Sequence, residues 1–322
     1  MEGSDSAVAV AVVSWNTREL LRRCLLSMQP YAEEGAADVW VVDNGSRDGS
    51  PEMVRVDFPW ARLLEPGENL GFGRAVNLAA RESGSQWIAA SNADVELLPG
   101  SLEGLVQAME ADPAAGAAAP RLILPDGSTQ HSVHRFPSPS LALMFGLAVH
   151  RLNHRIGDHL CLEGWWNPDR AREVDWAHGA FLLTRRKAFE QVGGFDESQW
   201  LYAEDIDLAW RLRKAGYRVR YVPDARVRHA AGAAARHAFG DPGRERRHME
   251  ATYVWLAKRR GVMLARLTAA LNFAGAVLRL LPLSLLAPIW PARWGPARHR
   301  ARRYLRLHGR GLREPLGLGG PG

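Results

Sequence analysis

The chain has 322 residues, 47% of them hydrophobic and 24% charged, enough to bury the core of one large domain with an appendage or of two domains. Its net charge of +6 is uneven, because residues 293–313 hold eight arginines and no acid. Such a segment is attracted to phosphates, acidic lipid headgroups or nucleic acid. The only cysteines, Cys24 and Cys161, are too few for a disulfide framework or a four-ligand zinc site, so we expect a reducing compartment. The N-terminal segment has no basic region, which predicts no signal peptide.

Strands and helices alternate through the first third of the chain. The β-branched run at residues 8–14 predicts a strand buried on both faces, and a helix with Thr17 as its N-cap follows. The alternation continues with strands at residues 38–44, 62–64 and 87–94 and with helices from residue 51, at 71–84 and at 99–110. This order predicts βαβ units and a largely parallel sheet covered by helices.

The middle of the chain is less regular. Residues 125–172 are rich in His, Pro and Trp, with a helix expected near residues 140–152, and loops of this length are usually functional. A strand and a helix return in "VDWAHGAFLLTRRKAF", and the turn "GGFDES" leads to the helical "LYAEDIDLAWRLRKAG". In the extended "YRVRYVPDARVRH", Pro223 is expected to place the second half at an edge or outside the sheet.

After Gly232 the chain becomes helical, first basic and then strongly apolar. Its uncharged stretches, residues 267–278 and 280–292, have 12 and 13 residues, whereas a spanning helix needs roughly 20. Arg279 separates the stretches, and Pro282 and Pro288 are expected to break the second. We expect helices that lie in or dip into a membrane surface, with the arginines holding anionic headgroups. The alternative is a pair of apolar helices packed on the preceding domain.

Three acids stand beyond strand ends, where ligands bind in an open α/β sheet. Asp43 ends the second strand, Asp94 ends the fourth, and Asp205 begins the helix after the late strand. In "SNAD", Asn92 and Asp94 offer hard oxygen ligands that suit Mg²⁺ or Mn²⁺ on a diphosphate, although a turn bonded to its own backbone more often explains such a pair. His229 could be a third ligand, but a lone His is more often structural.

Other motifs are incomplete or absent. The glycine-rich "NLGFGRAVN" opens a helix but fails as a dinucleotide fingerprint, because Asn77 stands where a glycine belongs and the first turn, "SWNTRE", has no glycine. No G-x-S-x-G or P-loop motif occurs, which disfavours serine hydrolases and P-loop enzymes. Nucleic acid is not an expected partner, since few aromatics interleave the tail's arginines and no recognition motif is present.

Taken together, the motifs resemble a known family. The segments "VVSWN", "VVDNGSRDGS", "NLGFGRAVNLA", "SNADVELLPGSL" and "LYAEDIDLAWRLRKAGYRVRYVPDARVRH" occur in the order and spacing of family 2 glycosyltransferases. Over residues 7–232 the sequence most resembles the bacterial rhamnosyltransferase-like branch. This resemblance implies a GT-A domain at residues 7–232, an α/β fold with a Rossmann-like, mostly parallel sheet and helices on both faces. Residues 233–322 would be a helical, membrane-associating extension.

The resemblance also implies a chemistry. It implies inverting transfer from a dTDP- or UDP-linked sugar with Mg²⁺ or Mn²⁺, to a glycan or polyprenyl-linked acceptor. Inversion needs one base for the acceptor proton, and a metal neutralises the leaving diphosphate. The branch suggests rhamnose from dTDP-rhamnose, a lipid-linked or cell-envelope polysaccharide acceptor, and a cytoplasmic enzyme peripheral on the inner face of the cell membrane. The alternative is a catalytically inactive nucleotide-sugar or glycan-binding protein on the same fold.

The family's roles carry over to single positions. Asp205 of the Glu204–Asp205 pair would be the catalytic base, and Asp94 and His229 would bind the metal. Asp43 would hydrogen-bond the nucleotide base. The remaining donor-binding residues would be Ser14, Trp15 and Asn16 at the nucleotide, Arg74, Asn77 and Asn92 near the donor, and Gly179 and Ala180 beside the sugar. Asn92 replaces the first acid of the family's D-x-D element, and Ala93 stands where the branch commonly has proline, which puts ligation by Asn92 in doubt and favours the inactive alternative.

Overall fold

The chain forms two compact units in a computed structural model that describes residues 8–199, 202–230 and 233–313. Unit 1 comprises Met1–His134 and Asn167–Gly240, and unit 2 comprises Arg135–Trp166 and Asp241–Gly322. Part of the irregular middle of the sequence therefore groups with the C-terminal region. The boundary at residue 232 stays a prediction.

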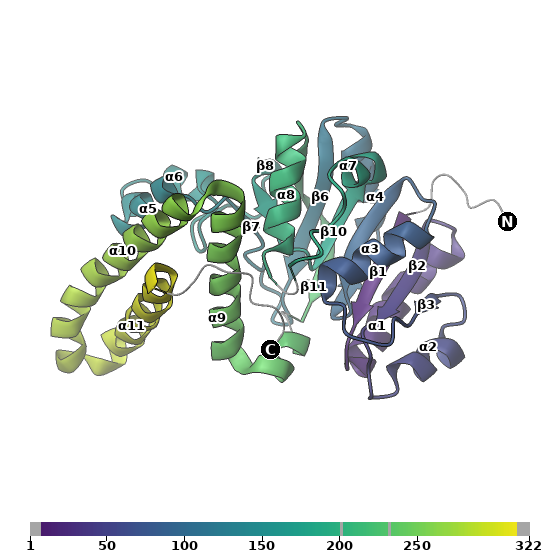
Figure 1. Ribbon diagram of the computed structural model, residues 1–322, viewed down its shortest axis with the longest axis horizontal. Coiled ribbons are helices and arrows are strands. Elements are labelled where there is room, and N and C mark those ends of the chain that lie inside the picture. Colours follow the sequence, from purple (N-terminus) through teal and green to yellow (C-terminus); the bar gives the residue numbers. More distant parts are fainter. Residues whose placement is uncertain (1–7, 200–201, 231–232, 314–322) are drawn as a thin grey trace. The chain divides into compact units, whose positions relative to one another are not determined.

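A nine-stranded mixed sheet carries the described part of unit 1 (Figure 1). Its strand order is β3-β2-β1-β4-β10-β6-β11-β5, and β8 also pairs with β11. The strands are β1 (Val8–Ser14), β2 (Ala37–Asp43), β3 (Arg62–Leu64), β4 (Trp87–Asn92), β5 (Val95–Leu97), β6 (Ala115–Ile123), β8 (Arg172–Val174), β10 (Phe181–Arg185) and β11 (Arg218–His229). Strands β7 (Val133–His134) and β9 (Trp176–Ala177) form a separate antiparallel pair.

The sheet is parallel where the sequence alternates most regularly. Strands β3, β2, β1 and β4 run parallel, as do β6 and β11, whereas β10, β5 and β8 pair antiparallel with their neighbours. The register pairs Ser14 with Asp43 and Val13 with Asn92. The carboxyl ends of β1, β2 and β4 therefore meet at one edge, as the alternation predicts.

Helices lie on both sides of this sheet (Figure 1). They are α1 (Arg18–Glu33), α2 (Ser50–Asp57), α3 (Phe72–Glu82), α4 (Ser101–Glu110), α7 (Arg186–Gln191) and α8 (Glu204–Lys214). Apolar residues of α1 at helical spacing, among them Leu21, Leu25 and Met28, are fully buried in one cluster with α4 and the β-branched residues of β1. The two helical faces exclude water from the sheet and leave its carboxyl edge as the place for a site.

Three local expectations are wrong. Thr17 does not cap α1 with its side chain; its hydroxyl lies 3.1 Å from that of Ser14, and the backbone N–H of Arg18 instead donates to the Asp48 carboxylate at 2.8 Å. Strand β4 ends at Asn92, so Asp94 lies in the turn to β5. The second half of β11 pairs with both β6 and β5 inside the sheet.

Pro223 is accommodated by a local irregularity. The register of β11 against β6 shifts between Val222 and Arg226. A bulge leaves residues out of the ladder, so the missing N–H of proline costs no strand hydrogen bond there. Beyond it the strand returns to the sheet and brings His229 opposite Val95.

Unit 2 is helical. Its elements are α5 (Pro139–Gly146), the 3-10 turn η1 (Val149–Arg151), α6 (His154–His159), the part of α9 (Ala233–Arg260) from residue 241, α10 (Val262–Ile289) and α11 (Pro291–Arg313). Helix α5 packs on α10 where two glycines meet, since a Cβ added to Gly275 would lie 2.6 Å from Cα of Gly146. Such a close approach of two backbones requires residues without side chains.

Helix α10 runs without a break, which corrects the expectation that prolines interrupt it. Its 28 residues include Pro282 and Pro288 at exposed positions near its C-terminal end. By length and composition, α10 is long and apolar enough to cross a membrane. The first uncharged stretch of the sequence and most of the second therefore lie in one helix.

Helix α3 is tied to the turn that follows α7 by one buried amide. Asn77 accepts from the Phe195 N–H at 2.8 Å and donates to the Phe195 carbonyl at 2.9 Å. Gly194 precedes Phe195 with a φ of +66°, and an added Cβ would lie 2.6 Å from the Asn77 amide oxygen. The turn therefore needs glycine at residue 194 for its backbone and for the space.

Two neighbouring glycine substitutions separate these requirements. Gly193 also has a positive φ, of +78°, but nothing lies within 4 Å of an added Cβ. We expect Gly194→Ala to destabilise unit 1 by about 1–3 kcal/mol more than Gly193→Ala, because overpacking adds to the shared backbone strain. Urea titration followed by tryptophan fluorescence measures both. Equal losses would show that the Asn77 contact is unimportant.

Candidate functional site

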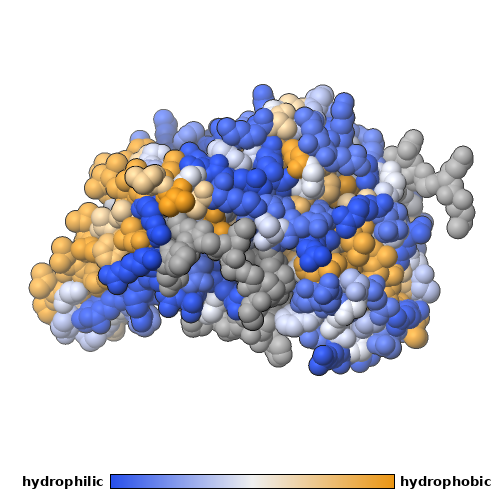
Figure 2. Space-filling model, in the orientation of Figure 1, coloured by the Kyte–Doolittle hydropathy of each residue, from blue (hydrophilic) through white to orange (hydrophobic). Residues whose placement is uncertain are grey.

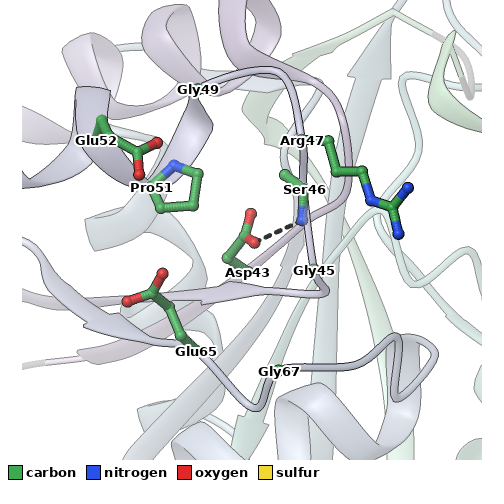
Figure 3. Close-up of a pocket in the computed structure, with 9 residues that line it drawn as sticks. All are labelled: Asp43, Gly45, Ser46, Arg47, Gly49, Pro51, Glu52, Glu65 and Gly67. Carbon is green, nitrogen blue, oxygen red and sulfur yellow. Dashed lines mark hydrogen bonds between the residues drawn. The ribbon is translucent and has the colours of Figure 1, made fainter.

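A pocket lies at the carboxyl ends of β2 and β3. Its volume is about 330 Å³, and Figure 3 shows Asp43 between the 45–49 loop and the chain at Glu65 and Gly67. Asp43 is buried, and one of its oxygens accepts the Ser46 N–H at 2.8 Å. The other, Oδ1, is buried with no hydrogen-bond partner among the described residues. A buried carboxylate oxygen without a donor is costly, so the pocket suits a ligand that carries an N–H group.

The residues at the end of β1 support the loop that lines this pocket. Asn16 has a left-handed φ of 51°, and its backbone N–H donates to the Ser46 hydroxyl at 2.8 Å. Its side-chain oxygen accepts the Arg47 N–H at 2.7 Å, while Trp15 is exposed beside it. Ser14 is fully buried and bonded to Thr17. The structure therefore brings Asn16 and Asp43 together through Ser46, a residue that sequence reasoning did not single out.

A second group of side chains lies where β4 turns into β5. Asp94 and His229 are both buried, and Asp94 Oδ1 lies 3.3 Å from His229 Nε2. The Asp94 carbonyl accepts the Ala230 N–H at 3.0 Å, which fixes the turn against the end of β11. Residues 135 positions apart are thus held side by side by the pairing of β5 with β11.

Gln130 fixes which nitrogen of His229 faces Asp94. The Gln130 amide oxygen lies 2.7 Å from Nδ1 of His229, so this nitrogen carries the proton and the lone pair of the neutral ring is on Nε2. His229 Nε2 has no hydrogen-bond partner among the described residues. The 3.3 Å between this nitrogen and the Asp94 carboxylate oxygen can be bridged by a proton or by a bound cation. These two donors fit a divalent metal ion, which takes imidazole nitrogen and carboxylate oxygen.

Further metal ligands are not evident in the part of the chain that the structure describes. No group of three or more His, Cys, Asp or Glu residues there could hold a metal ion. Asp94 and His229 therefore stay predicted metal ligands. Asn92, at the end of β4, donates its backbone N–H to the Ala180 carbonyl at 2.9 Å. Mg²⁺ commonly binds through one or two carboxylates together with water and substrate phosphates.

The third group is the acidic first turn of α8. Of its three acids, Asp207 is fully buried and pairs with Arg211 at 2.6 Å, which anchors the helix. Tyr202 and Ala203, just before the helix, have φ values of 67° and 66°. This left-handed conformation costs roughly 1–2 kcal/mol for each residue with a side chain, and such strain is typical of functional sites.

Glu204 and Asp205 form a buried carboxyl pair with unequal surroundings. Glu204 is buried, and its Oε2 has no hydrogen-bond partner in the described ranges. Asp205 is half-buried; it accepts the Gly179 N–H at 3.1 Å on one oxygen and the Ile206 N–H at 2.8 Å on the other. Asp205 has donors from two other residues that stabilise a negative charge, whereas the hydrogen bond that lowers the pKa of Glu204 comes from its own backbone. The positive end of α8 adds to these interactions.

This difference decides which acid ionises. Burial raises the pKa of Glu204 above its ordinary value, and the charge of Asp205 raises it further. Burial also raises the pKa of Asp205, but hydrogen bonds from the Gly179 and Ile206 backbones oppose that rise. Because like charges this close disfavour double ionisation, the proton of the pair belongs on Glu204 and the charge on Asp205.

The residues just before β10 join the second and third groups. Ala180 binds the backbone of Asn92, and Gly179 binds the carboxylate of Asp205. An added Cβ at Gly179 would lie 3.6 Å from both Asp205 Cβ and Phe72. Gly179 and Ala180 therefore lie between the end of β4 and the start of α8, and their place beside a donor sugar stays a prediction.

The two predicted residues on α3 have other partners. Asn77 holds Phe195 as described and also donates to Glu197 at 3.1 Å. Arg74 faces the same Glu197 carboxylate at 3.8 Å. The structure places both against the turn after α7, and their contact with a donor stays a prediction.

The family model "Glycosyl transferase family 2" matches residues 9–193, more than half of the chain. The chain belongs to glycosyl transferase family 2. The resemblance to the family and to its rhamnosyltransferase-like branch is thereby confirmed, since the chain is also 37% identical over 275 residues to a relative from Mycobacterium tuberculosis. That relative is an N-acetylglucosaminyl-diphospho-decaprenol L-rhamnosyltransferase, and the match covers 78% of this chain and 84% of the relative.

Two further likenesses are more limited. The rhamnosyltransferase WbbL of Escherichia coli is 52% identical over 50 residues, which is 16% of this transferase and 19% of WbbL. The solved mannosyltransferase PcManGT of Pyrobaculum calidifontis, in complex with GDP-Man and Mn²⁺, has a TM-score of 0.58 at 19% identity, with 95% of this chain and 87% of that chain covered. At this identity the match shows the fold, and the expected GT-A fold is confirmed.

The carboxyl pair predicts how the stability of the transferase depends on pH. A folded-state pKa above the ordinary value of 4.5 means that Glu204 stabilises the fold at low pH and that this contribution is lost as the pH rises above 4.5. Glu204→Gln keeps the neutral shape at every pH. We expect the difference in melting temperature, Glu204→Gln minus the natural protein, to be more positive at pH 8 than at pH 5. The same difference at both values would contradict the raised pKa.

Proposed function

We propose that this transferase moves rhamnose, with inversion, from dTDP-rhamnose to a lipid-linked saccharide of cell-envelope polysaccharide synthesis. The observation that carries the chemistry is the Glu204–Asp205 pair, in which backbone N–H groups hold the charge on Asp205. The activity of the Mycobacterium tuberculosis relative supports the sugar and an acceptor built on a polyprenyl diphosphate. A cytoplasmic enzyme bound to the inner face of the cell membrane suits such an acceptor.

The donor would lie along the carboxyl edge of the sheet. The free oxygen of Asp43 would accept an N–H of the nucleotide base, with Ser14, Trp15 and Asn16 around the nucleotide. Arg74, Asn77 and Asn92 are proposed near the donor, and Gly179 and Ala180 beside the sugar. Asp94 and His229 would hold Mg²⁺ or Mn²⁺, which offsets the charge of a diphosphate when bound.

Asp205 would act as the general base. Its carboxylate would take the proton of the acceptor hydroxyl as that oxygen forms a bond to the anomeric carbon, on the face opposite the breaking bond to the diphosphate. The developing negative charge leaves with the nucleoside diphosphate, so a second carboxyl is not needed as an acid. Glu204 would stay protonated and neutral beside the base.

Two isosteric substitutions test these roles against each other. With dTDP-rhamnose, Mn²⁺ and a GlcNAc-diphospho-polyprenol acceptor, we expect Asp205→Asn to lower kcat by about 10²–10⁴-fold, since its amide cannot take a proton. Glu204→Gln reproduces the proposed neutral form and should retain kcat within about tenfold. Radiolabelled rhamnose transfer measures both.

The outcomes separate the alternatives. Full turnover in Asp205→Asn would show that another group is the base. A loss in Glu204→Gln as large as that in Asp205→Asn would show that Glu204 must ionise. No transfer by the natural protein, with tight donor binding, would instead support the catalytically inactive alternative.

Gln130 provides a test of the metal site that needs no turnover. Gln130→Leu removes the oxygen that fixes the ring of His229, and loss of such an outer partner typically weakens metal binding by about 10–100-fold. We expect this loss for Mn²⁺ in isothermal titration calorimetry with dTDP present. Gln107→Leu, at an exposed position of α4, is the matched control and should bind Mn²⁺ normally. Equal affinities in the two variants would remove Gln130 from the site.

A further inference from the structure

One face of α10 is a continuous exposed apolar stripe. Twelve of the fifteen large hydrophobic side chains that are exposed in the described residues belong to unit 2, and seven of these lie in α10. Six of the seven exposed hydrophobic side chains of α10, with two exposed alanines between them, recur at intervals of three or four residues along the helix. The positions of the stripe are Met263, Leu267, Ala270, Ala274, Leu278, Leu281, Leu285 and Ile289.

This spacing puts the whole stripe on one side of the helix, because 3.6 residues complete a turn. Helix α10 has 28 residues, which corresponds to about 42 Å. The surface coloured as hydrophobic in Figure 2 follows this helix, with hydrophilic residues beside it. An apolar surface of this extent indicates a binding partner.

Three polar side chains of α10 bond other helices of unit 2. Arg266 donates to the Gly311 carbonyl at 2.6 Å, and Asn272 donates to the Tyr253 hydroxyl at 3.2 Å. Arg279 donates to the Phe145 carbonyl, and its guanidinium lies 4.1 Å from the centre of the Phe145 ring. The guanidinium of Arg279, which separates the two uncharged stretches, therefore has its partners within unit 2.

The arginines of helix α11 make a membrane-spanning α10 unfavourable. It packs along α10, with Gly311 against Ala269 and Gly309 against Phe273. Its residues include eight arginines and no acid up to Arg313. Each arginine costs about 2.5–3.5 kcal/mol at the centre of a bilayer, so a helix that carries α11 along its side cannot span the hydrocarbon core.

We propose that α10 lies in the plane of an anionic lipid bilayer, with the stripe in the headgroup–acyl boundary. Charge supports lipid as the occupant, because five arginines of the neighbouring α11 are exposed: Arg293, Arg300, Arg302, Arg306 and Arg313. Basic helices beside an apolar face bind anionic lipid surfaces, with the apolar face about 5–10 Å deep. The inference rests on the proposed function for its setting, since a lipid-linked acceptor lies at a membrane.

The depth of the stripe tests this orientation. Nitroxide labels at Met263→Cys, Ala274→Cys and Ile289→Cys are measured by electron paramagnetic resonance on vesicles of phosphatidylglycerol and phosphatidylethanolamine. The native Cys24 and Cys161 are buried and should stay unlabelled. We expect the three labels at the same shallow depth. A depth that passes from one surface through the bilayer centre to the other would overturn the proposal, because it would mean that α10 spans.

Vesicle binding tests the stripe itself. Leu281→Glu with Leu285→Glu should lower partitioning into these vesicles by about a hundredfold. Leu26→Glu with Val56→Glu, at side chains of unit 1 that are 53% and 76% exposed, should leave it unchanged. Equal binding by both variants would overturn the proposal. A natural protein that does not bind vesicles but forms a dimer in analytical ultracentrifugation, which the α10 variant dissociates, would also overturn it. Because binding is measured without donor or acceptor, its failure is distinct from failure of sugar transfer, which is assayed in detergent.

Discussion

Backbone donors around one carboxylate organise the candidate site. The N–H groups of Gly179 and Ile206 hold a negative charge on Asp205, while the neighbouring Glu204 is buried without a comparable donor. Gly179 can donate in this way because the segment it shares with Ala180 is bonded to the end of β4 on its other side. The Asp205 carboxylate, the end of β4 and the start of α8 therefore depend on the same short stretch of backbone.

Sequence patterns predicted the parts of this arrangement that depend on local order. Alternation of strands and helices predicted that Asp43 and Asp94 end strands at one edge of the sheet. Asp43 does end β2, whereas Asp94 lies two residues beyond the end of β4. Helix chemistry alone could not separate Glu204 from Asp205, because every acid in a first turn interacts favourably with the helix dipole. The resemblance to the family favoured Asp205, and the structure supplies a physical reason in the unequal hydrogen bonding of the two carboxyls.

Long-range contacts set the limit of that prediction. Gln130 reaches His229 across 99 residues and Asn77 reaches Phe195 across 118, and neither partner carries a local signal of the contact. The three-residue β5 was missed because so short a strand has no period to detect. In α10, Arg279 and two prolines suggested a break in the helix. The helix continues because Arg279 bonds a neighbouring helix and both prolines are at exposed positions.

We expect the carboxyl pair to carry one proton, on Glu204, at neutral pH. Infrared difference spectroscopy between the natural protein and each isosteric variant measures this directly. Glu204→Gln should remove the band of a protonated carboxyl group, and Asp205→Asn should remove a carboxylate band. Loss of a carboxylate band in Glu204→Gln, or of a protonated band in Asp205→Asn, would contradict the assignment of Asp205 as the ionised base.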